Sequence, residues 1–127
     1  MNHRGVGGKR PDLNNVYFRS RWEANTARLF NFFIRAGQIQ WWKFEPETFY
    51  FAGIKRGTIS YTPDFKVCKN DGTIEYYEVK GHHYPKGETA IKRFAKYYPQ
   101  HRLTVLDAEY FKAIKKQGMD ELIPGWE

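Results

Sequence analysis

Two short segments of this 127-residue sequence carry acidic and basic side chains at a spacing that suits metal-dependent hydrolysis. Asp64 follows Pro63, and Glu78 and Lys80 come fourteen and sixteen residues after it. The intervening Asn70-Asp71-Gly72 favours a tight turn, so the strand that carries Asp64 folds back on the strand that carries the other two. Side chains two residues apart in a strand share a face. We therefore expect Asp64, Glu78 and Lys80 to meet at one place.

This combination of groups suits hydrolysis of a phosphodiester bond. Mg²⁺ prefers oxygen ligands and retains several waters, so two carboxylates and a substrate phosphate are enough to bind it, and we expect Mn²⁺ to substitute. The ion would polarise the phosphate and lower the pKa of a bound water, and Lys80 would orient that water or offset charge in the transition state. The alternatives are a surface ion pair between Glu78 and Lys80, worth only ~0–1 kcal/mol, and a turn role for Asp64.

The elements that must position these residues follow from the sequence pattern. Ser20 and Glu23 have the spacing of a capping box, and apolar residues at helical spacing continue to Gly37, which predicts a helix over residues 20–35. Strands are predicted at 39–44, 48–51, 59–67 and 73–80, followed by a helix at 89–98, a strand at 103–106 and a helix at 108–117. This α-β-β-β-β-α-β-α order predicts an α/β fold with a central mixed β-sheet flanked by helices.

Composition also indicates the domain organisation and the cellular compartment of the protein. Residues 1–14 have three glycines, a proline and few apolar residues, which predicts a flexible basic arm before a single domain at 15–127. The lone Cys68 excludes an intrachain disulfide and indicates a reducing compartment. Because no secretory apolar region and no bilayer-length apolar stretch is present, we expect a cytoplasmic protein without a membrane partner.

The net charge of +7 is concentrated in two blocks. Residues 1–21 hold five Arg or Lys against one Asp, and residues 80–102 hold six against one Glu. Basic blocks around a carboxylate site fit binding of a polyanion, and solubility charge is the alternative. For His82 and the adjacent His83, simple solvent exposure is the alternative to a phosphate contact. The residues we expect to contact DNA are Arg4, Lys9, Arg10, Arg19, Arg21, His82, Lys86, Lys92, Arg93 and Lys96.

These motifs resemble those of the PD-(D/E)xK nucleases, which share the restriction-endonuclease-like core. The matching pieces are Tyr61-Thr62-Pro63-Asp64-Phe65 and Tyr77-Glu78-Val79-Lys80-Gly81, preceded by Glu23 on the first helix. The sequence is similar to the phage endonuclease I and Holliday-junction-resolvase branch over about residues 20–106. The resemblance implies that Asp64, Glu78 and the Val79 carbonyl bind the metal and that Lys80 is the catalytic lysine. It also implies that Glu23 contributes to the metal site, directly or through water, whereas a helix cap is the alternative role.

We therefore expect a Mg²⁺-dependent, structure-selective DNA endonuclease that resolves Holliday junctions or other branched DNA during recombination. A chain of this length leaves no separate domain for reading bases, so recognition of shape and backbone charge is expected. Symmetric cutting of a four-way junction needs two sites, which predicts a homodimer. The likeness to phage enzymes is consistent with a phage-encoded protein acting in the host cell. Alternatives are a sequence-specific or nicking endonuclease, a nuclease subunit of a recombination machine, and a catalytically silent DNA-binding module.

Overall fold

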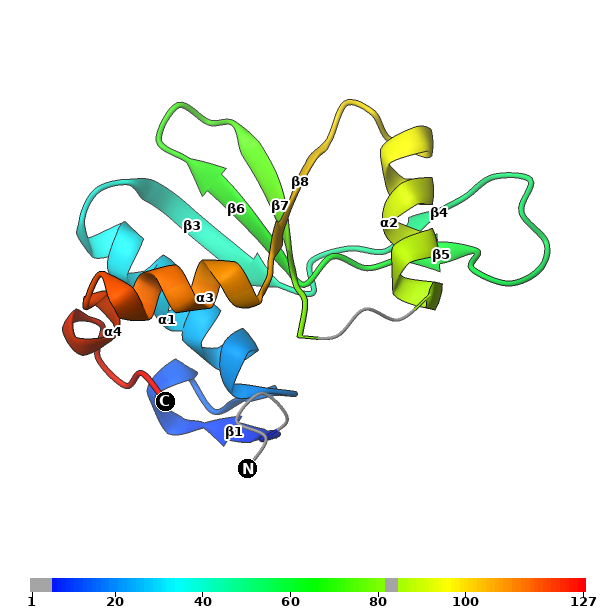
Figure 1. Cartoon of the computed structure of the whole chain (residues 1–127). Coiled ribbons are helices and arrows are strands. Elements are labelled where there is room, and N and C mark those ends of the chain that lie inside the picture. The colour runs from blue at the N-terminus through cyan, green and yellow to red at the C-terminus, as the bar shows by residue number, and fades with distance from the viewer. Residues whose placement is uncertain (1–5, 82–84) are drawn as a thin grey trace.

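A four-stranded mixed sheet forms the centre of the protein (Figure 1). The structure is a computed structural model that describes residues 6–81 and 85–127, except for the side chains of residues 85 and 86. The strand order is β3-β6-β7-β8; β6 pairs antiparallel with both β3 and β7, whereas β7 and β8 are parallel. The strands are β3 (Ile39–Phe44), β6 (Phe65–Lys69), β7 (Ile74–Val79) and β8 (Arg102–Leu106). The predicted α/β class and the central mixed sheet are confirmed.

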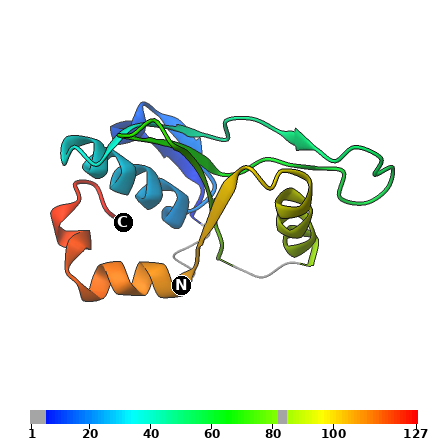
Figure 2. The same cartoon turned by 90° about the horizontal axis from the view of Figure 1, so that it is seen from above.

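Helices cover both faces of this sheet, with α1 and α3 on one face and α2 on the other (Figures 1 and 2). Their bounds are α1 (Arg21–Arg35), α2 (Pro85–Tyr97), α3 (Ala108–Lys116) and α4 (Met119–Leu122). The predicted start of the second helix at residue 89 is too late, because a proline is well tolerated in the first turn, where its missing N–H is not needed. Within the described ranges, no helix is long and apolar enough to cross a bilayer.

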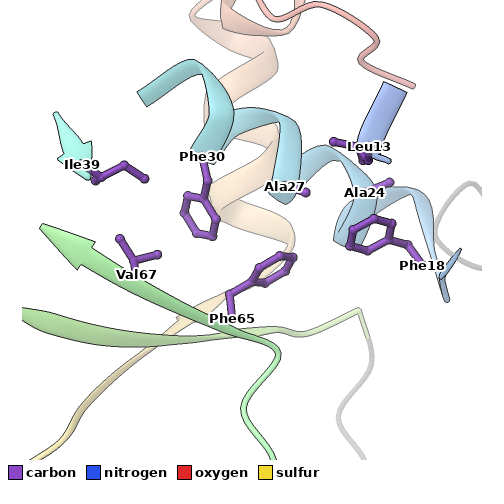
Figure 3. Packing of buried hydrophobic residues seen from close by; sticks show 8 residues of the cluster. All are labelled: Leu13, Phe18, Ala24, Ala27, Phe30, Ile39, Phe65 and Val67. Carbon is purple, nitrogen blue, oxygen red and sulfur yellow. The ribbon is translucent and has the colours of Figure 1, made fainter. Parts of the chain in front are cut away.

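The main core lies between α1 and the sheet (Figure 3). Small Ala24 and Ala27 face the sheet and let the helix approach it closely, while Phe30 meets Phe65 edge-on at 5.3 Å between ring centroids. Phe65 has no exposed surface, so the strand that follows Asp64 is anchored in this core. Burial of each such ring contributes about 1.5–3 kcal/mol to stability. The core therefore fixes the β6 end of the candidate site.

A second core joins α2 to the opposite face of the sheet. Strand β4 (Phe49–Tyr50) and strand β5 (Ser60–Tyr61) form a separate two-stranded antiparallel sheet, and Phe94 of α2 packs between Phe49, Tyr61 and Tyr76. The predicted single strand over residues 59–67 is thus two strands, β5 and β6. Pro63 separates them, because it has no N–H to donate to a strand ladder.

Residues 8–14, predicted to belong to a flexible arm, are instead part of the folded domain. Strand β1 (Gly8–Arg10), a 3₁₀ turn (Pro11–Leu13) and strand β2 (Val16–Phe18) form a hairpin beside α1. Leu13 and Phe18 are buried in the main core. The prediction was wrong there because these few apolar side chains find partners far away in the sequence; residues 1–5 lie outside the described part of the chain.

A network of ion pairs fastens this hairpin to α1 and to the last residues of the chain. Arg28 of α1 is 2.8 Å from both Asp12 Oδ2 and Glu127 Oε2, and Arg10 Nε is 2.8 Å from the same Glu127 oxygen. Asn25 exchanges two hydrogen bonds with the backbone of Glu127. The hydrogen bonds from Arg28 lower the pKa of Asp12. For Glu127, burial alone would raise the pKa, but the hydrogen bonds from Arg10 and Arg28 lower it.

Candidate active site

The β6–β7 pairing brings Asp64 and Glu78 together at one end of the hairpin. Phe65 is the register partner of Tyr77, so Asp64, one residue earlier, lies beside Glu78, one residue later. The Asp64 side chain accepts a 2.7 Å hydrogen bond from the backbone N–H of Val79. The backbone N–H of Lys80 donates to Leu106, at the end of the β7–β8 pairing, which extends this ladder by one residue. Two paired strands therefore fix the backbone of this site.

The two carboxylates share a largely buried environment. Asp64 is 6% exposed, and its burial together with the charge of Glu78 raises the pKa of its carboxyl to about 8. The hydrogen bond from Val79 and the charge of Arg19 oppose that rise. Burial also raises the pKa of Glu78, against the opposing effect of a hydrogen bond from Tyr61. The site thus holds more carboxylate groups than the nearby cations neutralise, and an additional cation would be stabilised there.

Arg19 contacts Asp64 directly, and its charge also lowers the pKa of Glu78 against the effect of burial. One guanidinium nitrogen lies 2.7 Å from Glu23 Oε2 and 3.1 Å from Asp64 Oδ1, and another lies 3.2 Å from Glu45 Oε2. Burial alone would lower the pKa of Arg19, but the hydrogen bond to Glu23 and the surrounding negative charges raise it. The Arg19 side chain is 55% exposed, whereas the Glu23 and Asp64 side chains that it pairs with are 7% and 8% exposed.

Glu23 lies in the first turn of α1, where it takes part in the contacts that begin the helix and binds Arg19. Ser20 caps α1 by accepting a 3.1 Å hydrogen bond from the Glu23 N–H. The Glu23 carboxylate binds the backbone N–H of Arg19 at 2.8 Å, one residue before the position expected for a capping box. Its other oxygen binds the Arg19 guanidinium. Glu23 is therefore linked to Asp64 by the Arg19 guanidinium, which binds both carboxylates. Its negative charge also raises the pKa of Asp64.

Lys80 is held by an acidic side chain that sequence reasoning missed. Its ammonium forms an ion pair with Glu88 in the first turn of α2, and only 9% of the Lys80 side chain is exposed. The charge of Lys80 also acts on Glu78, whose pKa it lowers against the effect of burial. The signal that could have found Glu88 is that it is the one acidic residue in the basic block at 80–102.

Tyr61 is a second site residue missed from the sequence. Its buried hydroxyl donates a 2.5 Å hydrogen bond to Glu78 Oε1. Burial, and then the charge of Glu78, raises the pKa of Tyr61, so the hydroxyl stays protonated and remains a donor. This contact fixes one oxygen of Glu78 and links strand β5 to the carboxylate pair.

The donor set suits a hard cation, although the carboxylates do not surround a metal position as they stand. Across residues 6–81 and 85–127, no three His, Cys, Asp or Glu side chains are grouped so that they could hold a metal ion. The Arg19 guanidinium lies between Glu23 and Asp64, where it supplies the positive charge. The charge of Arg19 offsets only part of the effect that burial and Glu78 have on Asp64. Two carboxylates suffice for Mg²⁺ because the ion keeps several waters. The chemistry of the pair therefore fits a divalent ion.

The basic residues predicted to contact DNA fall into different environments. Arg10 is the clear correction: it is 6% exposed and is occupied by Glu127 and backbone carbonyls, so it stabilises the fold instead. Arg21 is half-buried beside Glu127, and half-buried Arg93 donates to the Thr58 carbonyl. The exposed cations among those predicted are Lys9, Lys92, Lys96 and, in part, Arg19. Outside the described residues or side chains lie Arg4, His82, His83 and Lys86.

Comparison with known proteins gives one family match. The model of a family described as "Protein of unknown function (DUF1064)" matches residues 6–120, which includes both cores and all the site residues described above. Searches against curated proteins and against solved structures find no significant match.

Proposed function

Because the chain belongs to DUF1064, a family of proteins of unknown function, we propose its function from the site itself: a metal-dependent DNA endonuclease. The observation that carries the proposal is the buried Asp64 carboxylate beside Glu78, with Lys80 on the same strand end. Carboxylates at this density have no stabilising role in a core, but they suit a bound cation and a hydrolytic reaction.

The arrangement of elements around the site supports a restriction-endonuclease-like core. Arg19, just before α1, and Glu23 in its first turn lie beside the carboxylates, the β6–β7 hairpin carries the two motifs, and β8 lies parallel beside β7. This is the order that the PD-(D/E)xK resemblance implies for the two motifs and the preceding helix.

Each side chain at the site has a separate task in this proposal. Asp64 and Glu78, together with the Val79 carbonyl, would hold Mg²⁺ or Mn²⁺, which when bound supplies polarisation of the phosphate and a more acidic water. Tyr61 orients Glu78 through its hydrogen bond. Glu88 positions the Lys80 ammonium, which offsets the negative charge that develops on the phosphate oxygens. Arg19 supplies positive charge beside Asp64 and Glu23.

Branched DNA is the substrate that we propose, with Holliday junctions as the leading example and recombination as the setting. Lys9, Lys92 and Lys96 are exposed cations that would contact DNA phosphates. Such a protein recognises the shape and the phosphates of DNA. Symmetric cutting of a four-way junction requires two sites, so the proposed enzyme is a homodimer.

A cleavage assay with defined DNA substrates tests this function. In Mg²⁺ or Mn²⁺, the protein is expected to cut a synthetic four-way junction far faster than a linear duplex of the same sequence, and sedimentation should give the mass of a dimer. Equal cutting of both substrates would remove the junction preference but keep the nuclease. If neither DNA is cut in either metal but both are bound, a DNA-binding module without catalysis becomes the better explanation.

Comparing Ser20→Ala with Glu23→Gln separates the capping role of α1 from a role at the site. Ser20→Ala removes the acceptor for the Glu23 N–H and should lower the free energy of unfolding by about 1 kcal/mol, with little effect on the rate of cleavage. Glu23→Gln keeps an acceptor for the Arg19 backbone but weakens the hold on its guanidinium, so cleavage should fall about 10–100-fold. Urea denaturation and single-turnover cleavage measure the two effects. Lost stability with an unchanged rate in Glu23→Gln would make Glu23 a cap only.

A further inference from the structure

The connection between β4 and β5 projects away from the central sheet, beyond α2 (Figures 1 and 2). The paired residues Tyr50 and Ser60 lead into a loop over residues 51–59, in which most side chains are exposed. Two glycines at φ +84° and +73°, Gly53 and Gly57, bend this loop in a conformation that other residues rarely adopt. We call residues 49–61 the β4–β5 arm.

The charge of the β4–β5 arm has one sign. Lys55 and Arg56 are adjacent and exposed near its far end, between the two glycines, and residues 48–63 contain no Asp or Glu. Exposed arginine and lysine side chains without acidic neighbours in the same segment suit a phosphate backbone. The arm is therefore complementary in charge to a nucleic acid.

The base of the β4–β5 arm is fixed rather than free. Phe51 is only 2% exposed, and its ring packs against Tyr97 of α2 at 5.3 Å between centroids. The Tyr98 hydroxyl donates a 2.6 Å hydrogen bond to the Tyr50 carbonyl, and Arg93 donates to the Thr58 carbonyl. Contacts on both sides of the loop thus hold its base against α2.

The same arm is joined directly to the candidate site. Tyr61, the last residue of β5, donates its hydroxyl hydrogen to Glu78, and Asp64 follows three residues later in the chain. A shift of the arm would therefore disturb the carboxylate pair, and the paired strands set the position of the arm relative to the site.

We propose that the β4–β5 arm is a DNA-contacting element in which Lys55 and Arg56 bind backbone phosphates at a distance from the scissile bond. Two cations on a loop with a fixed base can position a duplex through its phosphates without reading its bases. The arm would therefore set where the backbone enters the site. Lys92 and Lys96 are exposed on α2, which packs on the arm, so this unit carries further positive charge. The inference rests on the proposed function, since it takes DNA as the substrate.

A binding measurement in EDTA tests the arm without any cleavage. Lys55→Ala/Arg56→Ala should weaken binding of a fluorescent four-way junction about tenfold at moderate salt. The slope of log affinity against log salt should become shallower by about 2, one unit for each lost phosphate contact. The matched control is Lys115→Ala/Lys116→Ala, which removes the same charge from exposed positions on α3 and should bind nearly as the wild type does. The charge-preserving Lys55→Arg/Arg56→Lys variant should also bind normally.

The outcomes separate this inference from the proposed function. If both alanine pairs weaken binding equally, net charge alone explains the effect and the arm has no special role, while cleavage in Mg²⁺ still supports the nuclease. Tighter binding of duplex RNA than of DNA through the same two residues would overturn the assignment of DNA as the partner. If the wild type neither binds nor cuts DNA, both proposals fail.

Discussion

Asp64→Asn is expected to reduce DNA cleavage by about 10²–10³-fold or more, with DNA binding unchanged or tighter. The amide keeps an oxygen that can accept the hydrogen bond from the Val79 N–H, so the backbone of the site should persist. It removes the negative charge that a divalent ion requires and that repels DNA phosphate. Single-turnover cleavage in Mg²⁺ and anisotropy titration in EDTA measure the two quantities.

Asp71→Asn is the matched control for this substitution. Asp71 lies in the turn at the other end of the β6–β7 hairpin, it is exposed, and its replacement changes the net charge by the same amount. This variant should cut DNA at the wild-type rate. A parallel loss of binding and cleavage in Asp64→Asn would indicate misfolding, and an unchanged cleavage rate would exclude Asp64 from the reaction. Lys80→Ala should likewise lose cleavage while retaining most of the binding.

The metal-free protein is expected to lose stability as the pH rises from about 5 to about 8. Burial and the charge of Glu78 raise the pKa of Asp64 to about 8, above the value of about 3.9 for an exposed aspartate. Between these two values the folded state binds more protons than the unfolded state, so the free energy of unfolding falls with increasing pH. The slope for this one group is at most about 1.4 kcal/mol per pH unit.

Urea denaturation in EDTA at several pH values measures this effect. The wild type should become less stable relative to Asp64→Asn as the pH rises, because the variant has no proton to lose at this position. A divalent ion should reverse the loss and stabilise the wild type more at pH 8 than at pH 6, since it replaces that proton. At about 100 times its dissociation constant it contributes about 2.7 kcal/mol. Parallel stability curves for the two proteins, or equal stabilisation of both by Mn²⁺, would contradict the prediction.

The parts of the fold that the sequence predicted are those with local signals. Ser20 and Gly37 bound α1, and Asn70-Asp71-Gly72 gives the turn of the β6–β7 hairpin. Strand β3 has the predicted bounds. A hairpin turn with a period-2 pattern also sets which residues stand opposite each other. For this reason the proximity of Asp64 and Glu78 follows from the sequence alone.

The parts that could not be predicted depend on partners distant in the sequence. Arg10 looked like a residue of a free basic arm because its partner, Glu127, lies 117 positions away. Glu88 pairs with Lys80 because α2 begins at Pro85, which places the first turn of the helix beside the end of β7. Arg19 was predicted as a phosphate contact, and no local pattern indicated that it would bridge Glu23 and Asp64.

The network of Arg10, Asp12, Arg28 and Glu127 has a consequence for the order in which the chain folds. Glu127 lies 117 positions from Arg10 and 99 from Arg28, so the entropy of closing a long loop must be overcome before its contacts contribute. We therefore expect the β1–β2 hairpin and residues 123–127 to dock after α1 and the sheet have assembled. Arg28 binds both Asp12 of the hairpin and Glu127 of the last residues. If either segment detached, Arg28 would lose one of its charged partners, so the two segments should open and close as one cooperative unit.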